Sequence, residues 1–395
     1  MLLGLYSVIP RPGWFGPAAR DGRDPASSTD SAPPAAASFH IPSLDGIRAV
    51  AFLLVFFNHV GWTRFPAALG VTIFFFLSGY LITTLLRREF DRTGGVALGA
   101  FYLRRVYRIL PPLYVVLLAA LVVKAVVDPA GLRWAALIAQ VCQFSNYYVI
   151  YWKDEGLSLG MIVTWSLAVE EHFYLLFPLV YLLLRRRLTA GGQAIALLAL
   201  CGLVLAWRCV LVYGADVPWI RIYSASDTRA DALLFGCILA VVGNPALDVA
   251  GPARRRWDLA LVPVALLVIA ACWVIPGHRF HHTFRYTLQS LAMMPLFTAA
   301  VRYPDWLPFR PLQWRVTRWV GVLSYSLYLI HLNVIEWLLP LGLSRAPLAI
   351  VSLAISLGLA CAMDRWVERP CARLRRSIGR APRATAGLQP ALALQ

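Results

Sequence analysis

An arginine and a histidine in one apolar segment are the first residues whose types and spacing suggest chemistry. Arg48 and His59 lie eleven residues apart in the segment that begins at Ser43. Eleven residues of α-helix make about three turns plus 20° and rise about 16 Å, so both side chains share one face. Histidine accepts and returns a proton near neutral pH, as the activation of a hydroxyl requires. We predict that His59 is catalytic and that a hydrated groove could run along the face it shares with Arg48.

A group of arginines follows the second apolar segment. Arg104, Arg105 and Arg108 fall within one or two helical turns, just before Pro111 and Pro112. Plain anchoring at the cytoplasmic membrane surface is one explanation of such arginines. The other is that their guanidinium groups bind phosphates, which they contact in a bidentate manner. We predict that the three arginines bind the phosphates of a nucleotide-like donor.

Two adjacent carboxylates lie in the apolar segment that starts at Thr164. Glu170, Glu171 and His172 stand about one and a half turns into it, and ionisable groups inside a membrane span by default mark a functional path. We predict that at least one of the two glutamates faces a polar cavity. One can orient a catalytic histidine, and the other can cap the helix or pair with an arginine; the sequence does not say which.

A third polar group opens the segment after Ser226, with Asp227, Arg229 and Asp231 in close succession. An internal ion-pair network and a site for substrate hydroxyls explain it equally well. We place these residues among the candidate substrate-binding residues, together with Asp45 and Trp165. A further histidine, at position 331, follows the hydroxyl-rich stretch Ser324–Tyr328, and we expect it to be structural.

The composition places these residues in a membrane protein. The chain has 395 residues, of which 59% are hydrophobic and 14% charged, and its mean hydropathy is +0.65. Basic residues of membrane proteins collect in cytoplasmic loops, so the net charge of +17 reports topology and does not indicate nucleic-acid binding. The seven cysteines form no CxxC pair, and neither a disulfide framework nor a metal site is predicted.

The positioning elements are predicted to be transmembrane helices, in an all-α polytopic bundle. Apolar blocks near the roughly 20 residues that span a bilayer predict about ten crossings, or eleven if residues 134–150 also cross. The ten blocks are 46–63, 69–86, 110–127, 165–184, 192–213, 230–246, 258–275, 285–301, 319–341 and 347–366. We predict a disordered tail over 1–40, a membrane domain over 41–372 and a basic, mostly disordered tail over 373–395.

Charge decides the orientation of this bundle. With the N-terminus in the cytoplasm and residues 134–150 not crossing, the arginine runs 185–187 and 254–256 fall inside, as the positive-inside tendency favours. A crossing at 134–150 would invert every later segment. We therefore predict a multi-pass protein of the inner (plasma) membrane, with both termini cytoplasmic and residues 128–164 as a long outer excursion.

These motifs in this order resemble the acyltransferase-3 family of integral membrane O-acyltransferases, over about Ser43 to Pro370. The segments that carry the resemblance are Ser43–Arg48 with His59, Gly70–Thr83, Arg104–Pro111, Trp165–Tyr174 and Leu323–His331. Arg48 and His59 match the family's arginine–histidine motif, which is thought to be catalytic. Arg105 and Arg108 fall in its basic motif, and His172 stands where glutamine is common.

The resemblance implies an enzyme that transfers an acetyl or other short acyl group from an acyl-CoA donor. The implied acceptor is the hydroxyl of a sugar, or of a glycosylated natural product such as a macrolide, and no permanently bound cofactor is implied. Direct transfer and a covalent acyl-histidine both remain open. The main alternative is a secondary transporter, which would move a solute without consuming a thioester; a scaffold that merely binds acyl-CoA is another.

Overall fold

The computed structural model describes residues 40–378, except 154, 159, 250 and 252–253. All regular elements in this part of the chain are helical, which confirms the predicted class. The predicted tail over residues 1–40 lies outside the described residues except for His40, as does most of the tail over 373–395. Helix α16, Arg369–Ser377, runs across the boundary expected at residue 372.

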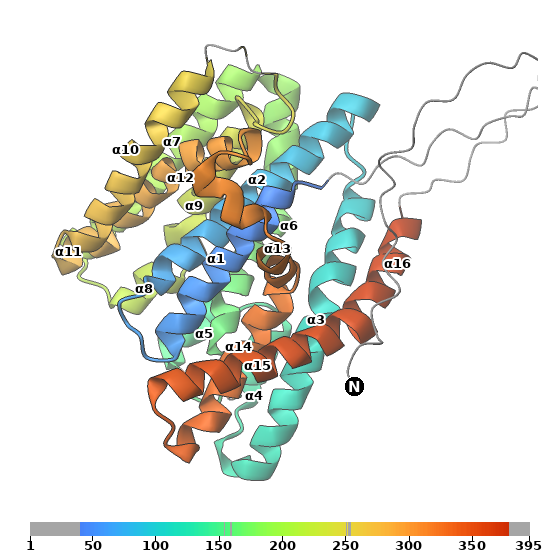
Figure 1. Ribbon diagram of the computed structural model, residues 1–395, viewed down its shortest axis with the longest axis vertical. Coiled ribbons are helices and arrows are strands. Elements are labelled where there is room, and N and C mark those ends of the chain that lie inside the picture. Colours follow the sequence, from blue (N-terminus) through green and yellow to red (C-terminus); the bar gives the residue numbers. More distant parts are fainter. Residues whose placement is uncertain (1–39, 154, 159, 250, 252–253, 379–395) are drawn as a thin grey trace, which may run out of the picture. The chain divides into compact units, whose positions relative to one another are not determined.

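The helices of the first half are α1 (Pro42–His59), α2 (Ala67–Thr93), α3 (Leu98–Val127), α4 (Trp134–Val141), α5 (Ser145–Trp152), α6 (Thr164–Arg187) and α7 (Ala190–Cys209). Those of the second half are α8 (Trp219–Ser224), α9 (Ser226–Val241), α10 (Arg254–Val274), α11 (His278–His282), α12 (Phe284–Arg302), α13 (Arg315–Val322), α14 (Ser324–Leu338) and α15 (Arg345–Met363). In Figure 1, α1 and α2 run through the middle of the bundle, with α10 to α12 on one side and α3 and α16 on the other.

Six of the described helical stretches are long and apolar enough to cross a bilayer, built on α2, α3, α6, α7, α10 and α15. Helices α13 and α14 meet at a 75° bend and give a seventh if they form one broken span. The predicted blocks at α1, α9 and α12 are helical but do not belong to this set, and each of these helices carries charged residues. The count of ten crossings therefore stays a prediction.

Residues 134–150 form two short helices instead of one span. Helices α4 and α5 are separated at Cys142–Phe144, where Gln143 has a φ of 61° in the left-handed region. The side chain of Asn146 on α5 donates to the Ser224 carbonyl and to Ser226 Oγ, at 3.3 and 3.1 Å. These bonds hold the segment against α8 and α9, and neither short helix is long enough to cross.

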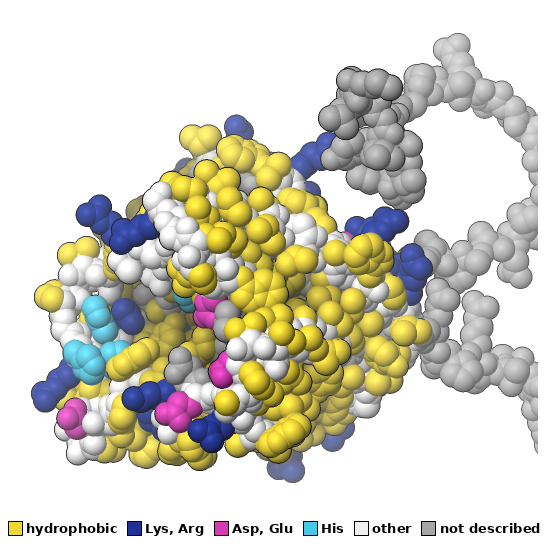
Figure 2. Space-filling view, turned by 90° about the horizontal axis from the view of Figure 1, so that it is seen from below, with side chains coloured by type: hydrophobic (Ala, Val, Ile, Leu, Met, Phe, Trp, Pro, Cys, Tyr) yellow, Lys and Arg dark blue, Asp and Glu magenta, His cyan; other side chains and the backbone are white. Residues whose placement is uncertain are grey.

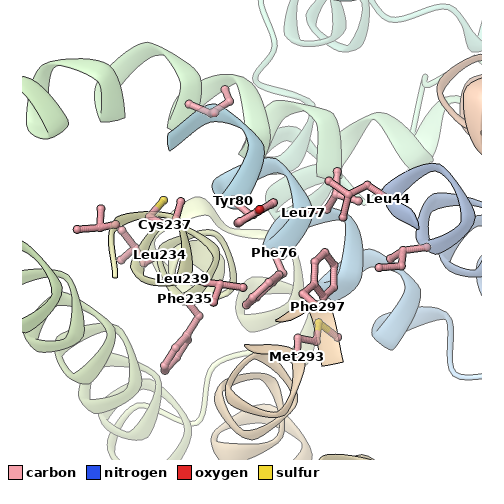
Figure 3. Close-up of a cluster of buried hydrophobic side chains, with 14 of the residues drawn as sticks. Leu44, Phe76, Leu77, Tyr80, Leu234, Phe235, Cys237, Leu239, Met293 and Phe297 are labelled. Carbon is pink, nitrogen blue, oxygen red and sulfur yellow. The ribbon is translucent and has the colours of Figure 1, made fainter. Parts of the chain in front are cut away.

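The core is built around α2 and α9, which approach one another backbone to backbone. A Cβ atom added to Gly79 would lie 1.9 Å from the Leu233 carbonyl oxygen, and one added to Gly236 would lie 2.1 Å from that of Phe76. Only glycine fits at this crossing, as is common where membrane helices pack closely. Figure 3 shows the side chains around it, including Phe76 and Phe297, whose ring centroids lie 4.6 Å apart.

Hydrogen bonds and an ion pair hold the C-terminal half of α2 in place. Tyr80 donates to the Asn244 side chain at 2.9 Å, and the Arg87 guanidinium pairs with Asp248 at 2.5 Å. Burial alone would raise the pKa of Asp248, but the hydrogen bond and the charge of Arg87 outweigh it and lower the pKa. These contacts join α2 to the connection between α9 and α10.

The predicted orientation of the bundle is testable by labelling of single cysteines in a cysteine-free background. A cysteine at Arg187 should react with a membrane-impermeant maleimide only after the inner side is opened, because basic runs stay cytoplasmic. A cysteine at Glu155, in the connection after α5, should react in intact cells. If, in intact cells, the cysteine at position 155 is protected and the one at position 187 reacts, the orientation is the opposite of the predicted one.

Candidate active site

Helix α1 carries the arginine and the histidine at opposite ends. Arg48 pairs with Asp45, at 2.9 Å between Nη1 and Oδ1, near the start of the helix, and His59 is its last residue. The rise between them is about 16 Å on one face, as the sequence predicts. Arg48 lines a cavity between the helices, whereas His59 is not among its lining residues.

This central cavity lies among α1, α2, α3, α6 and α14. Its volume is about 140 Å³. That is close to the roughly 150 Å³ of a cavity that holds one benzene, so it accepts a narrow group and not a whole nucleotide or sugar. Val71 and Ile82 both line it, and eleven residues of α2 separate them by about 16 Å, so the cavity is long and thin. Its charged lining residues are Arg48, Arg105, Arg108, Glu170 and Glu368.

Two of the three predicted donor-binding arginines face this cavity. Arg105 lies over the rings of Phe101 and Tyr174, with its guanidinium carbon 5.6 and 5.1 Å from their centroids. Arg108 also lines the cavity. Arg104 does not, since it pairs with Glu89 at 3.1 Å. The structure thus divides the motif into one arginine that joins α3 to α2 and two that are directed to the cavity.

The two glutamates are divided in the same way. Glu170 lines the cavity and accepts hydrogen bonds from Ser78 Oγ at 3.1 Å and Tyr174 OH at 2.9 Å. Glu171 is not among the lining residues, and the neighbouring His172 contacts Ser226 Oγ at 2.7 Å. Of the two carboxylates, Glu170 is therefore the one that faces the polar cavity.

His59 has a second histidine as its partner. Its Nδ1 atom lies 2.9 Å from Nε2 of His331, and the two rings are stacked with centroids 5.1 Å apart. His331 is fully buried, and its Nδ1 lies 2.9 Å from the Tyr328 carbonyl and 3.1 Å from the Leu327 carbonyl. The sequence suggested that His331 is structural and that a glutamate could orient the catalytic histidine. In the structure, the group beside His59 is His331.

These contacts assign the protons of an uncharged histidine pair. Carbonyl oxygens only accept, so Nδ1 of His331 carries the hydrogen and its Nε2 is an acceptor. Nδ1 of His59 must then be the donor, which leaves the lone pair of His59 on Nε2. The assignment follows from counting donors and acceptors. It gives His59 one fixed nitrogen able to take a proton or attack a carbonyl.

Tyr328 connects the central cavity to the histidine pair. It lines the cavity, its hydroxyl lies 2.7 Å from Ser166 Oγ, and its ring centroid is 5.7 Å from that of His331. Sequence reasoning did not single out Tyr328, although residues 328 and 331 are three apart and so share one face of α14. Ser78 and Glu368 were also missed, and no sequence signal distinguishes them.

The remaining candidates lie outside this cavity. Asp231 pairs with Arg208 at 2.5 Å and both side chains are fully buried, while Asp227 pairs with Arg221 at 2.6 Å. Trp165 packs on the rings of Phe75 and Tyr223. For the two aspartates, the structure has the internal ion pairs that were one of the two alternatives.

Arg229 is fully buried but is not paired with either aspartate. Its guanidinium carbon lies 4.0 Å from the centroid of the Tyr286 ring and 5.4 Å from those of Phe75 and Tyr223. Nη2 donates to Thr72 Oγ1 at 3.0 Å, while Nε and Nη1 have no hydrogen-bond partner among the described residues. Its direct contacts are therefore aromatic rings and one hydroxyl, and no carboxylate among the described residues is paired with it.

The described residues contain no candidate metal site. Among them, no three histidine, cysteine, aspartate or glutamate side chains lie close enough together to hold an ion. The charged groups of the cavity are instead arginines and carboxylates, which suit an anionic ligand and proton transfer.

Comparison with known proteins gives one family. A family model described as an acyltransferase domain, of the acyltransferase-3 type, matches residues 41–365. No solved structure matches the chain.

Three curated relatives illustrate the similarity. Peptidoglycan O-acetyltransferase OatA of Listeria monocytogenes is 28% identical over 349 residues, which cover 84% of this chain and 56% of the relative. The putative peptidoglycan O-acetyltransferase YrhL of Bacillus subtilis is 31% identical over 315 residues, 75% of this chain and 49% of the relative. A putative O-acetyltransferase of Staphylococcus aureus is 30% identical over 319 residues, with coverage of 75% and 51%. The chain spans about half the length of these relatives.

The buried pair of Asp231 and Arg208 leads to a prediction about stability. Asp231→Asn should lower the free energy of unfolding by about 3–5 kcal/mol, because Arg208 is left as an uncompensated buried charge. Unfolding by SDS titration of the purified protein measures this. The control is Asp227→Asn, whose pair with Arg221 is partly exposed and should contribute less than about 1 kcal/mol. Equal losses in the two variants would contradict a structural role for Asp231.

Proposed function

Because the chain belongs to the acyltransferase-3 family, we propose that it is a membrane O-acyltransferase that moves an acetyl or other short acyl group from an acyl-CoA to a glycan hydroxyl. The observation that carries the proposal is the central cavity, which has arginines at one end and adjoins the His59–His331 pair through Tyr328. The names of the relatives, peptidoglycan O-acetyltransferases, support the same transfer.

The donor is proposed to enter from the arginine end. Arg105 and Arg108 bind its phosphates, since guanidinium groups match the charge and geometry of phosphate oxygens. The cavity is too narrow for the nucleotide but fits an extended arm, and its length of about 16 Å brings the thioester close to Tyr328. Glu170 holds Ser78 and Tyr174 in place along the wall of this passage.

The chemical step is assigned to Nε2 of His59. It takes the proton of the acceptor hydroxyl while the hydroxyl oxygen forms a bond to the acyl carbon. The carbon–sulfur bond of the thioester breaks, and the imidazolium returns the proton to the leaving thiolate, which departs as free CoA. His331 acts as a positioning residue, because its Nε2 accepts from His59 Nδ1 and keeps the lone pair on the other nitrogen.

A covalent route uses the same nitrogen. Nε2 of His59 attacks the acyl carbon, and the carbon–sulfur bond breaks to release CoA as a thiolate. The acceptor oxygen then attacks the acyl carbon, the acyl–nitrogen bond breaks, and the hydroxyl proton passes to the freed Nε2 and from there to solvent, which protonates the thiolate. Rapid quench with radiolabelled acyl-CoA in the absence of acceptor separates the routes, since only the covalent one labels the protein. Under either route the lone pair on Nε2 is required.

The acceptor is proposed to be a glycan of the cell envelope that arrives from outside the plasma membrane. This side is assigned because His59 ends α1 at the end opposite Arg48, and the basic segments favour a cytoplasmic N-terminus. Both chain termini are then cytoplasmic. A macrolide acceptor has no support from the names of the relatives, so a glycan is preferred.

The role of the histidine pair is tested by CoA release from acetyl-CoA by the purified protein. His59→Ala should lower turnover by about 10²–10⁴-fold, the range of general acid–base catalysis, without loss of donor binding. His331→Phe removes the acceptor for His59 Nδ1 and should lower kcat by about 10²-fold through misorientation. His331→Gln, whose amide oxygen can accept the same bond, should recover part of that loss.

The melting temperature of each variant provides the structural control. If His331→Gln and His331→Phe have the same kcat at equal melting temperature, His331 does not position His59. If His59→Ala keeps more than about a tenth of the wild-type turnover, outside the range for an acid–base group, His59 is not the base.

Donor binding by the cavity arginines is tested by comparing the KM for acetyl-CoA with the KM for the acceptor. Arg105→Ala with Arg108→Ala should raise the KM for acetyl-CoA far more than the KM for the acceptor, because their charge is directed to the donor phosphates. Arg104→Ala is the matched control, since Arg104 is paired with Glu89 away from the cavity. Equal effects of the two changes on donor KM would mean that the arginines only anchor α3.

A further inference from the structure

A second cavity lies at the end of α1 where His59 stands, and we call it the α11 cavity. It is an open cavity bordered by the α1–α2 connection, α8, α10, α11 and α12, and its volume is about 820 Å³. This size falls in the range of roughly 300–1,000 Å³ that small-molecule sites occupy. Asn58, the residue before His59, is part of its lining. Figure 2 shows a hollow in this face, with histidine side chains along its left rim.

Aromatic rings form much of its wall. Trp219 and Tyr223 come from α8, Trp273 from α10 and Tyr286 from α12, and all four line the cavity. Trp219 and Tyr223 lie against one another, with ring centroids 5.8 Å apart. Trp and Tyr combine a flat apolar face with a polar edge. Sugar rings have apolar C–H faces and polar edges, so a wall of this kind complements a sugar.

Several polar atoms of the lining have no partner. Oε1 of Gln289, a residue that is 4% exposed, has no hydrogen-bond partner among the described residues, and neither does His282 Nδ1 or the donor Nε of Arg285. Buried polar atoms are nearly always hydrogen-bonded in native proteins. Unused donors and acceptors around one cavity therefore indicate a ligand that completes them.

The fixed charge around the cavity is positive. Arg285 lines it, and no aspartate or glutamate is among its lining residues. Arg229 lies directly behind the wall, 4.0 Å from the Tyr286 ring centroid, with two unpartnered nitrogens. Burial is the main cause that lowers the pKa of His282 to about 4, and the charges of His278 and Arg285 contribute, so His282 is neutral at pH 7. Arg285 is half-buried and no carboxylate lines the cavity beside it, so the charge of an anionic ligand would complement its guanidinium group.

We propose that the α11 cavity is the acceptor site and that it selects a sugar bearing a negatively charged substituent, a carboxylate or a phosphate, which pairs with Arg285. The rings of Trp219 and Tyr223 stack on the sugar. The inference rests on the proposed transfer function, and it places the acceptor next to the helix end that carries His59.

The test measures sugar binding by the full chain in nanodiscs of zwitterionic lipid, from the change in tryptophan fluorescence. The probes are the N-acetylglucosaminyl–N-acetylmuramic acid disaccharide with its free carboxylate, the same disaccharide as a carboxamide, and the pair of glucose 1-phosphate and glucose. Wild type should bind the charged member of at least one pair about tenfold more tightly, as a charge-assisted hydrogen bond provides. The pair that shows the preference identifies carboxylate or phosphate.

Substitutions of two arginines test which of them recognises the negative charge of the sugar. Arg285→Gln should abolish the preference, and Arg285→Lys should keep most of it. Arg279→Gln is the matched control, because Arg279 lies on the neighbouring α11 over the Tyr213 ring and is not part of the lining. Equal binding of charged and neutral sugars by wild type, or an equal loss in Arg279→Gln, would overturn the proposal, as would competitive displacement of the sugar by phosphatidylglycerol added to the nanodiscs.

Binding is measured without acyl-CoA, so the two proposals fail separately. If the charged sugar binds through Arg285 but acetyl-CoA is never consumed, the proposed function fails and the anionic-sugar site stands. If acetyl transfer occurs with equal kcat/KM for the charged and neutral sugars, the function stands and the selection by Arg285 is wrong.

Discussion

The backbone contact between α2 and α9 is the constraint on which the rest of the structure depends. Gly79 and Gly236 allow the two helices to touch at distances that no other residue permits. From this crossing, α2 extends in both directions along the central cavity, and it supplies Ser78 to Glu170 and Phe75 to the ring cluster around Arg229. A wider separation would loosen both cavities at once, because α2 and its neighbours form walls of each.

Buried charge is accommodated in three different ways along these helices. Asp231 and Arg208 neutralise one another, as a buried pair must. Arg229 has aromatic rings in place of a carboxylate, so its charge is only partly compensated. The histidine pair avoids charge altogether, since a neutral imidazole supplies the orienting acceptor that a carboxylate supplies in many enzymes. In the functional proposals, the compensated pair is structural and the neutral histidine pair transfers protons, while Arg229 adds positive charge behind the wall of the α11 cavity.

Much of the site was predictable because helical spacing is local. The shared face of Arg48 and His59 and the division of α3 into a basic start and an apolar end follow from residues close in sequence. The sequence also predicted that Glu170 or Glu171 faces a polar cavity, but only the structure selects Glu170. The partner of His59 did not follow, since 272 positions separate it from His331 and only the tertiary packing of α14 on α1 brings them together. The same limit applies to Arg208, which lay in a block read as apolar and is the partner of Asp231.

The number of crossings depends on more than the length and composition of each helix, and the count of ten stays a prediction. Hydropathy compares a helix with lipid, but α9 packs against α2, α6, α7 and α12, and most of its residues are buried among them. A polar helix in that position is stable only when its neighbours surround it. The ten helical blocks were located correctly as helices, while their relation to the bilayer depends on packing that a single-sequence window does not include.

This position of α9 has a consequence for biogenesis. A segment of 16 residues that carries Asp227, Arg229 and Asp231 among its first six residues is costly to insert into a bilayer alone, because each charge that enters the hydrocarbon adds up to about 2.5–3.5 kcal/mol. Helices α2, α6 and α7 precede it in the chain and emerge from the ribosome first. Arg208, at the end of α7, leaves the ribosome 23 residues ahead of its partner Asp231. The late arrival of α9 would supply both the missing charge and the glycine that fits against α2, so that insertion and folding of this helix become one event.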